Sequence, residues 1–181
     1  MPDPVSAQVA ASLKEVFAAL DHCFDESEEW LRTRPEYPEA WSVAEHLEHL
    51  RLANHYLLLT IDKGCRKALK RAARQPIPRT TSELAPLAPI ADPHAFPWLP
   101  PQHMLPGPVG DLAELRRQLR GQLGHCLELL ELLPAGAGRL CTIRMSVHEL
   151  GKLDLYQWFY FLAQHVRYHL NLLRARGKGD T

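Results

Sequence analysis

The distribution of proline constrains the fold of this chain most strongly. Ten of its fifteen prolines lie between residues 75 and 108, and the other five are at positions 2, 4, 35, 38 and 134. Proline lacks a backbone N–H and clashes with the preceding turn of a helix, so residues 75–108 cannot form one long helix. Long helices are therefore predicted only in the segments between these prolines.

Two amphipathic helices are predicted before the proline-rich segment, because apolar residues recur there three or four positions apart. The first is predicted over about residues 4–34, with Asp3 as its N-cap. The second is predicted over about residues 43–73, where Ser42 and Glu45 have the spacing of a capping box.

Two more amphipathic helices are predicted after the proline-rich segment. One runs from about Asp111 to Leu133. The other opens at Asp154, which forms a second capping box with Gln157. Residues 140–147 are predicted to be extended, but no convincing set of strands accompanies them.

This pattern predicts an all-α fold, a four-helix bundle in which residues 1–181 form a single domain. A short connection makes the first two helices antiparallel, and the long proline-rich crossover between helices two and three can run back along the bundle. The predicted order is therefore up-down-down-up. We expect residues 75–108 to pack on the bundle, since their large apolar side chains would otherwise lie in water. These apolar residues are Phe96, Trp98, Leu99, Met104 and Leu105.

Charge and cysteine content limit the classes of partner. The chain has 21 basic and 21 acidic residues, so its formal net charge is zero. This balance argues against nucleic acid and against an anionic membrane surface as partners. No apolar run has the length of a membrane span, and we recognise no signal peptide. The four cysteines are widely spaced without a CxxC motif, so a cytoplasmic protein with reduced thiols is expected.

Two histidines, His165 and His169, lie four positions apart on the apolar face of the last predicted helix. Side chains at this spacing stack one turn above the other, and such a pair can chelate one metal ion. Buried histidines that bond to neighbouring groups explain the same pattern, so both interpretations remain open.

A metal site needs a third ligand, and the second predicted helix contains two candidates. His49 would lie at the level of the His165–His169 pair if the second and fourth helices pack antiparallel. His46 is nearer the centre of the apolar stripe. Spacing alone therefore does not decide between His46 and His49.

Two segments resemble a known family. Residues 41–50 read WSVAEHLEHL and resemble a family stretch whose ligand histidine follows the tryptophan by eight positions. Residues 148–158 read HELGKLDLYQW and precede HVRYH at residues 165–169; they resemble the family motifs HPxxGxLxxxxW and HxxxH. On these motifs the chain resembles the DinB/YfiT-like superfamily of small four-helix metalloproteins.

The resemblance implies a divalent metal ion held by His49, His165 and His169. The expected metal is nickel or zinc, with manganese and iron as further options. The family often has arginine directly before the last histidine and glutamine three positions after it, where this chain has Tyr168 and Leu172. These departures leave the ligands in place and bear on contact with a substrate, as does Glu149 in place of a family proline.

The resemblance also implies a function. Three imidazoles with an open position suit a catalytic metal that activates water or a thiol. We therefore expect a metal-dependent thiol S-transferase or hydrolase that acts on a small molecule, with a low-molecular-weight thiol as a candidate partner and a homodimer as the assembly. The alternative is a non-catalytic, stress-associated metal-binding or interaction bundle. No catalytic residue is assigned.

Other polar residues have simpler explanations. Glu45 could orient a ligand, but its capping role explains it. Tyr56 and Tyr160 could donate a hydrogen bond to a substrate and are expected to pack. His148 is expected to be structural. His94 and His103 are expected to be on the surface. The remaining histidines are expected to be on the surface or bonded to neighbouring groups: His22, His46, His55 and His125.

Overall fold

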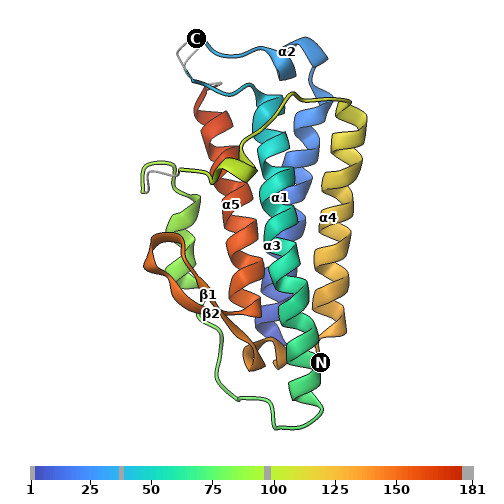
Figure 1. Ribbon diagram of the computed structural model, residues 1–181, viewed down its shortest axis with the longest axis vertical. Coiled ribbons are helices and arrows are strands. Elements are labelled where there is room, and N and C mark those ends of the chain that lie inside the picture. Colours follow the sequence, from blue (N-terminus) through green and yellow to red (C-terminus); the bar gives the residue numbers. More distant parts are fainter. Residues whose placement is uncertain (1–2, 37–38, 96–98, 177–181) are drawn as a thin grey trace.

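Five α-helices and one antiparallel pair of strands form the framework of the computed structural model, which describes residues 3–36, 39–95 and 99–176 (Figure 1). The α-helices are α1 (Pro4–His22), α2 (Glu28–Arg32), α3 (Val43–Ala72), α4 (Leu112–Leu132) and α5 (Leu155–Arg176). The strands are β1 (Thr142–Met145) and β2 (Gly151–Asp154). Short 3-10 helices are η1 (Cys23–Asp25), η2 (Ala85–Ala91), η3 (Gln102–Met104), η4 (Ala137–Leu140) and η5 (Val147–Glu149).

Side-chain caps set the starts of the long helices, as the sequence predicts. The Ser42 hydroxyl accepts a hydrogen bond from the Glu45 N–H (3.2 Å), and the Glu45 carboxylate accepts one from the Ser42 N–H (2.8 Å). Asp154 and Gln157 form the same reciprocal pair at α5. Asp111 caps α4 through the backbone N–H groups of its first turn. Each cap satisfies backbone donors that would otherwise have no partner.

The prediction of one continuous helix over residues 4–34 is wrong. The α1 helix ends at His22, and α2 begins after Ser27, whose hydroxyl accepts a hydrogen bond from the Trp30 N–H (3.2 Å). Arg32 then donates to the carbonyls of Val109 (2.9 Å) and Gly110 (2.7 Å), just before α4. A local cap and a distant contact thus outweigh the helical periodicity of this segment.

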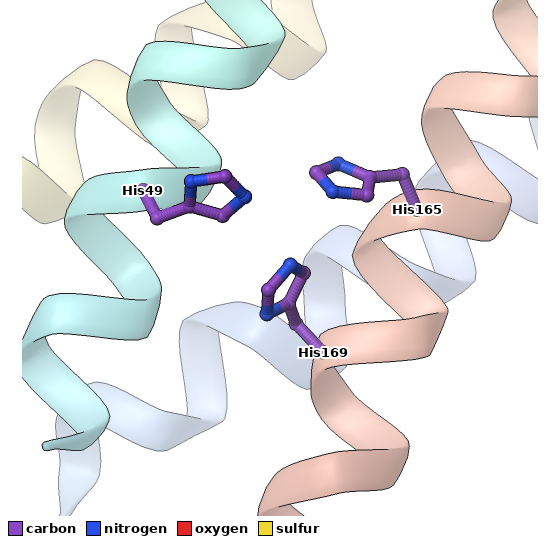
Figure 2. A group of neighbouring side chains, drawn as sticks. All are labelled: His49, His165 and His169. Carbon is purple, nitrogen blue, oxygen red and sulfur yellow. The ribbon is translucent and has the colours of Figure 1, made fainter. Parts of the chain in front are cut away.

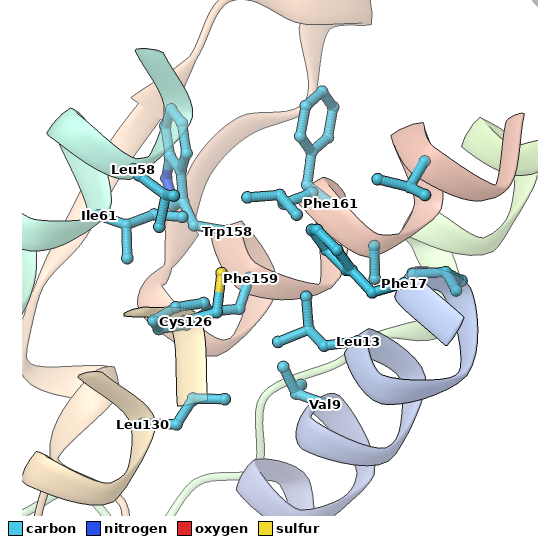
Figure 3. Packing of buried hydrophobic residues seen from close by; sticks show 14 of the residues in the cluster. Val9, Leu13, Phe17, Leu58, Ile61, Cys126, Leu130, Trp158, Phe159 and Phe161 are labelled. Carbon is cyan, nitrogen blue, oxygen red and sulfur yellow. The ribbon is translucent and has the colours of Figure 1, made fainter. Parts of the chain in front are cut away.

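The four long helices, α1, α3, α4 and α5, lie side by side along the length of the molecule (Figure 1). The α1 and α3 helices each contact both α4 and α5. Their apolar faces meet in one hydrophobic core, which Figure 3 shows at close range. The labelled residues of this core are Val9, Leu13, Phe17, Leu58, Ile61, Cys126, Leu130, Trp158, Phe159 and Phe161.

The proline-rich segment between α3 and α4 contacts α5 through η2. Leu87 and Ile90 are buried there, and Asn171 on α5 donates to the Ala91 carbonyl (2.9 Å). Two apolar residues of this segment do not pack on the bundle as expected: Leu99 is 90% exposed and Leu105 is 45% exposed. Met104 is half-buried, whereas Phe96 and Trp98, named in the same expectation, lie outside the described residues.

The two strands form a small hairpin between α4 and α5. The extended conformation predicted near residues 140–147 is confirmed in β1, which pairs antiparallel with β2 so that Thr142 faces Asp154 and Met145 faces Gly151. Two positive φ angles lie where the turn leads into β2, 55° at Glu149 and 73° at Gly151, the first residue of that strand. The hairpin corrects the expectation of a fold without a set of strands.

Among the described residues, no helix combines the length and apolar character needed to cross a membrane.

Candidate metal centre

Two helices bring three buried histidines together. His49 comes from α3, whereas His165 and His169 come from successive turns of α5, and the three rings point toward one another (Figure 2). One nitrogen from each ring lies within 4.8 Å of the other two. In the described part of the chain, no other group of three or more histidine, cysteine or acidic residues is arranged this closely.

The donor set of this cluster fits a transition metal. Zinc binds imidazole nitrogens at about 2.0–2.1 Å, so two nitrogens on one ion are at most about 4.2 Å apart. The nitrogens of the cluster lie within 4.8 Å of one another, close to this limit. Neutral nitrogen donors without a carboxylate suit zinc, nickel, copper or iron better than magnesium or calcium.

A backbone carbonyl fixes the orientation of His49. Its Nδ1 donates a hydrogen bond to the carbonyl oxygen of Met104 at 2.7 Å. With the proton on Nδ1, the lone pair is on Nε2, the arrangement that metal-binding histidines have when a second group holds the ring. Met104 belongs to η3, so the proline-rich segment contributes directly to the geometry of the cluster.

His46 holds His169 in a similar way. The two Nδ1 atoms are 2.9 Å apart, and His46 is buried. One nitrogen must donate and the other accept; with His169 as the donor, the Nε2 lone pair of His169 is available to a metal. The structure thus places His46 beside the three-histidine cluster as a bonded neighbour. His46 was expected to be on the surface or bonded to a neighbouring group, and the second alternative is confirmed.

Loss of this neighbour is expected to weaken metal binding without abolishing it. Groups that orient a metal ligand typically contribute about 10- to 100-fold in affinity. We expect His46→Ala to raise the metal dissociation constant by this factor, measured by competition with a chromophoric chelator. His46→Gln, which can still accept from His169, should recover part of the loss, and His55→Ala on the exposed face of α3 should have no effect. Unchanged affinity in His46→Ala would contradict the role.

Burial favours the neutral form of His49 and His165. Removal from water lowers the pKa of His49, although its bond to the Met104 carbonyl acts in the opposite direction. Burial, with a smaller contribution from the proximity of His49, lowers the pKa of His165 to about 3. A metal binds the unprotonated imidazole, so at neutral pH these groups need not release a proton first.

The cluster borders a cavity of about 800 Å³. Its walls come from α3, α5, the end of β1 and the segment before and within η3. The ring of Tyr56 on α3 contacts that of His103 in η3, with 4.5 Å between their centroids. A cavity of this size is in the usual range for small-molecule sites. Because the histidines line it, a molecule inside the cavity can reach the cluster.

The other polar residues singled out in the sequence lie in different places: at a helix cap, beside the core, in the cavity wall or on the surface. Glu45 caps α3 and pairs with Arg34, as its capping role predicts. Tyr160 packs beside the core, whereas Tyr56 lines the cavity. The side chain of His148 lies outside the described residues. Four histidines are exposed away from the cavity, as expected: His22, His55, His94 and His125.

Two contributions to the site were not predicted from the sequence. His103 lines the cavity, and the Met104 carbonyl holds His49. Both depend on where a long loop folds back, and neither a histidine surrounded by prolines nor a backbone carbonyl has a recognisable pattern. Tyr168 and Leu172, where the chain departs from the pattern it resembles, also line the cavity.

Comparison with known proteins gives one match. The family model described as the DinB superfamily matches residues 7–173, which include α2, α3 and α4 in full, most of α1 and α5, and all three clustered histidines. The chain matches none of the curated proteins and none of the solved structures with which it was compared.

Proposed function

The chain belongs to the DinB superfamily, and on that premise we propose that it binds one divalent metal ion beside a small-molecule cavity. The ligands in this proposal are His49, His165 and His169. The observation that carries it is the convergence of three buried imidazoles from α3 and α5. Three protein ligands leave a coordination position open, which is typical of catalytic rather than structural sites.

The proposed metal is nickel or zinc, and manganese and iron are further candidates. A bound ion of this kind would supply a Lewis acid next to the cavity. The chain itself would orient the ligands: the Met104 carbonyl holds His49, and His46 holds His169. Apolar side chains such as Trp158 and Phe161 would limit the access of water to a bound molecule.

The proposed activity is a metal-dependent thiol S-transferase or a hydrolase that acts on a small molecule. The cavity supports a small-molecule substrate, and a low-molecular-weight thiol is the proposed partner for the transferase. The proposal also includes a homodimer in the cytoplasm. The cytoplasmic location is supported by the four cysteines, which are all free, as expected in a reducing compartment. The up-down-down-up order of the long helices is part of the same proposal and is supported by the course of the chain in Figure 1.

Elemental analysis of protein purified without an affinity tag is the first test. We expect one divalent ion per chain. A panel of electrophiles with low-molecular-weight thiols, with and without nickel, zinc and manganese, then tests the activity. Turnover that survives complete metal removal would contradict the proposed chemistry. Metal binding with a blank panel favours the alternative, a non-catalytic metal-binding or interaction bundle.

Acidification is expected to weaken both metal binding and the stability of the metal-free protein. The pKa values of His49 and His165 are lowered in the folded state, to about 3 for His165, whereas an unfolded histidine has a pKa of about 6.5. Below that value the unfolded chain binds more protons, so the free energy of unfolding falls as pH decreases from about 6.5 toward 3. Urea denaturation of the metal-free protein between about pH 7.5 and pH 4.5 measures this decline.

A pair of variants separates this effect from general acid sensitivity. His165→Gln should flatten the decline, and the exposed His125→Gln should not. Carboxylates such as Asp21, whose pKa is lowered by hydrogen bonds from Arg116 and Arg120, stabilise the fold until the pH falls below about 3.9. A wild-type denaturation midpoint that does not change over the histidine range would contradict the prediction.

A further inference from the structure

We infer that the cavity beside the histidine cluster selects an uncharged, mainly apolar molecule over one that carries an ionised group. This inference rests on the proposed function for the role of the cluster. It deepens that proposal by assigning the chemical class of the bound molecule.

The lining of the cavity carries the inference. In the described part of the chain, none of the residues that line it is aspartate, glutamate, lysine or arginine. The polar side-chain groups apart from the histidines are hydroxyls and the indole N–H groups of Trp41 and Trp158, and most of the remaining wall is aliphatic, aromatic or proline. These apolar wall residues include Leu57, Pro100, Met104, Met145, Phe161 and Leu172.

Two arginines close in sequence to the clustered histidines are paired away from the cavity. Arg51 on α3 forms two hydrogen bonds with Glu48, at 2.9 and 2.6 Å. Arg167, between the two α5 histidines, pairs with Glu15 on α1 at 3.0 Å. Neither arginine lines the cavity, so neither offers a cation to a carboxylate or phosphate bound there.

The energetic consequence follows from solvation. An ionised group that leaves water for an apolar site without a partner loses several kcal/mol of hydration, on the order of the whole binding free energy of a weak ligand. An uncharged aromatic or aliphatic body loses little hydration and gains from burial against the wall. The cavity should therefore discriminate strongly between two molecules of the same shape that differ in one distal charge.

A matched pair of probes tests this in the full chain. 2-Naphthol is uncharged at pH 7, and 6-hydroxy-2-naphthoate has the same ring system with an ionised carboxylate. Their dissociation constants are measured by isothermal titration calorimetry with metal-free and zinc-treated protein. We expect 2-naphthol to bind metal-free protein at least about ten-fold more tightly than the naphthoate.

Three variants locate the binding. Thr60→Trp adds bulk to the cavity wall and should weaken 2-naphthol binding, whereas Lys67→Trp on the exposed face of the same helix should not. Ser146→Lys places a cation on the lining at an exposed position and should tighten binding of the naphthoate. Ser146→Lys keeps the test decisive if Thr60→Trp fails to fold.

The outcomes separate this inference from the metal proposal. Equal or tighter binding of the naphthoate to metal-free protein would overturn the inference, as would undetectable binding of 2-naphthol or an unchanged affinity in both cavity variants. Preference for 2-naphthol in a protein that binds no zinc would support the inference while the metal proposal fails. Zinc binding without discrimination between the probes would support the metal proposal and overturn this inference.

Discussion

The His169→Ala variant is expected to lose most of the divalent metal that we propose for the wild-type protein. Two remaining imidazoles make a poor site, since stable sites for zinc and related metals need at least three protein ligands. The expected loss of affinity is greater than about 100-fold, which exceeds the effect of removing a group that only orients a ligand. Elemental analysis after dialysis and chelator competition measure the loss.

The controls for this prediction distinguish ligands from neighbours. His125→Ala, on the exposed surface of α4, should keep the full metal content. His46→Ala should fall between the wild type and His169→Ala. If His169→Ala keeps full occupancy while His46→Ala loses it, the choice of ligands is wrong. Circular dichroism of the metal-free variants checks that each still folds.

Replacement of Phe159 by alanine is expected to reduce the free energy of unfolding by about 3–5 kcal/mol. Phe159 is fully buried on α5, in the core that α1, α3 and α4 share (Figure 3). The substitution removes the transfer free energy of the ring and leaves a cavity that the surrounding helices fill only in part. Urea denaturation of metal-free protein at neutral pH measures the change without a contribution from metal binding.

An exposed residue provides the matched control for Phe159. Leu132, at the end of α4, is 62% exposed, so Leu132→Ala should change stability by no more than about 0.5 kcal/mol. A loss below about 1 kcal/mol in Phe159→Ala would mean that the core tolerates the missing ring, contrary to the packing described here.

Local signals in the sequence account for the helix starts and for part of the candidate site. Ser42 and Asp154 act through residues three positions away, so their capping pattern is visible in the sequence. The His165–His169 pair is also local. The choice of His49 over His46 depended on the family resemblance, because both face the interior and both are buried.

Features that depend on distant partners were not predictable in this way. Strand β2 is four residues long and is defined by its pairing with β1. The break before α2 depends on Ser27 and on contacts of Arg32 with the chain beyond residue 108. The bond between His46 and His169 joins positions 123 residues apart, and no local periodicity specifies it.

The hydrogen bond from His49 to the Met104 carbonyl has a consequence for thermodynamic linkage. The segment that contains Met104 lines the cavity and also fixes the ring that points into the histidine cluster. A molecule that displaces this segment also displaces the orienting carbonyl of His49. If the cluster binds an ion as proposed, such a molecule would couple occupancy of the cavity to affinity for the ion, and the free energy by which each alters the other would be the same in both directions.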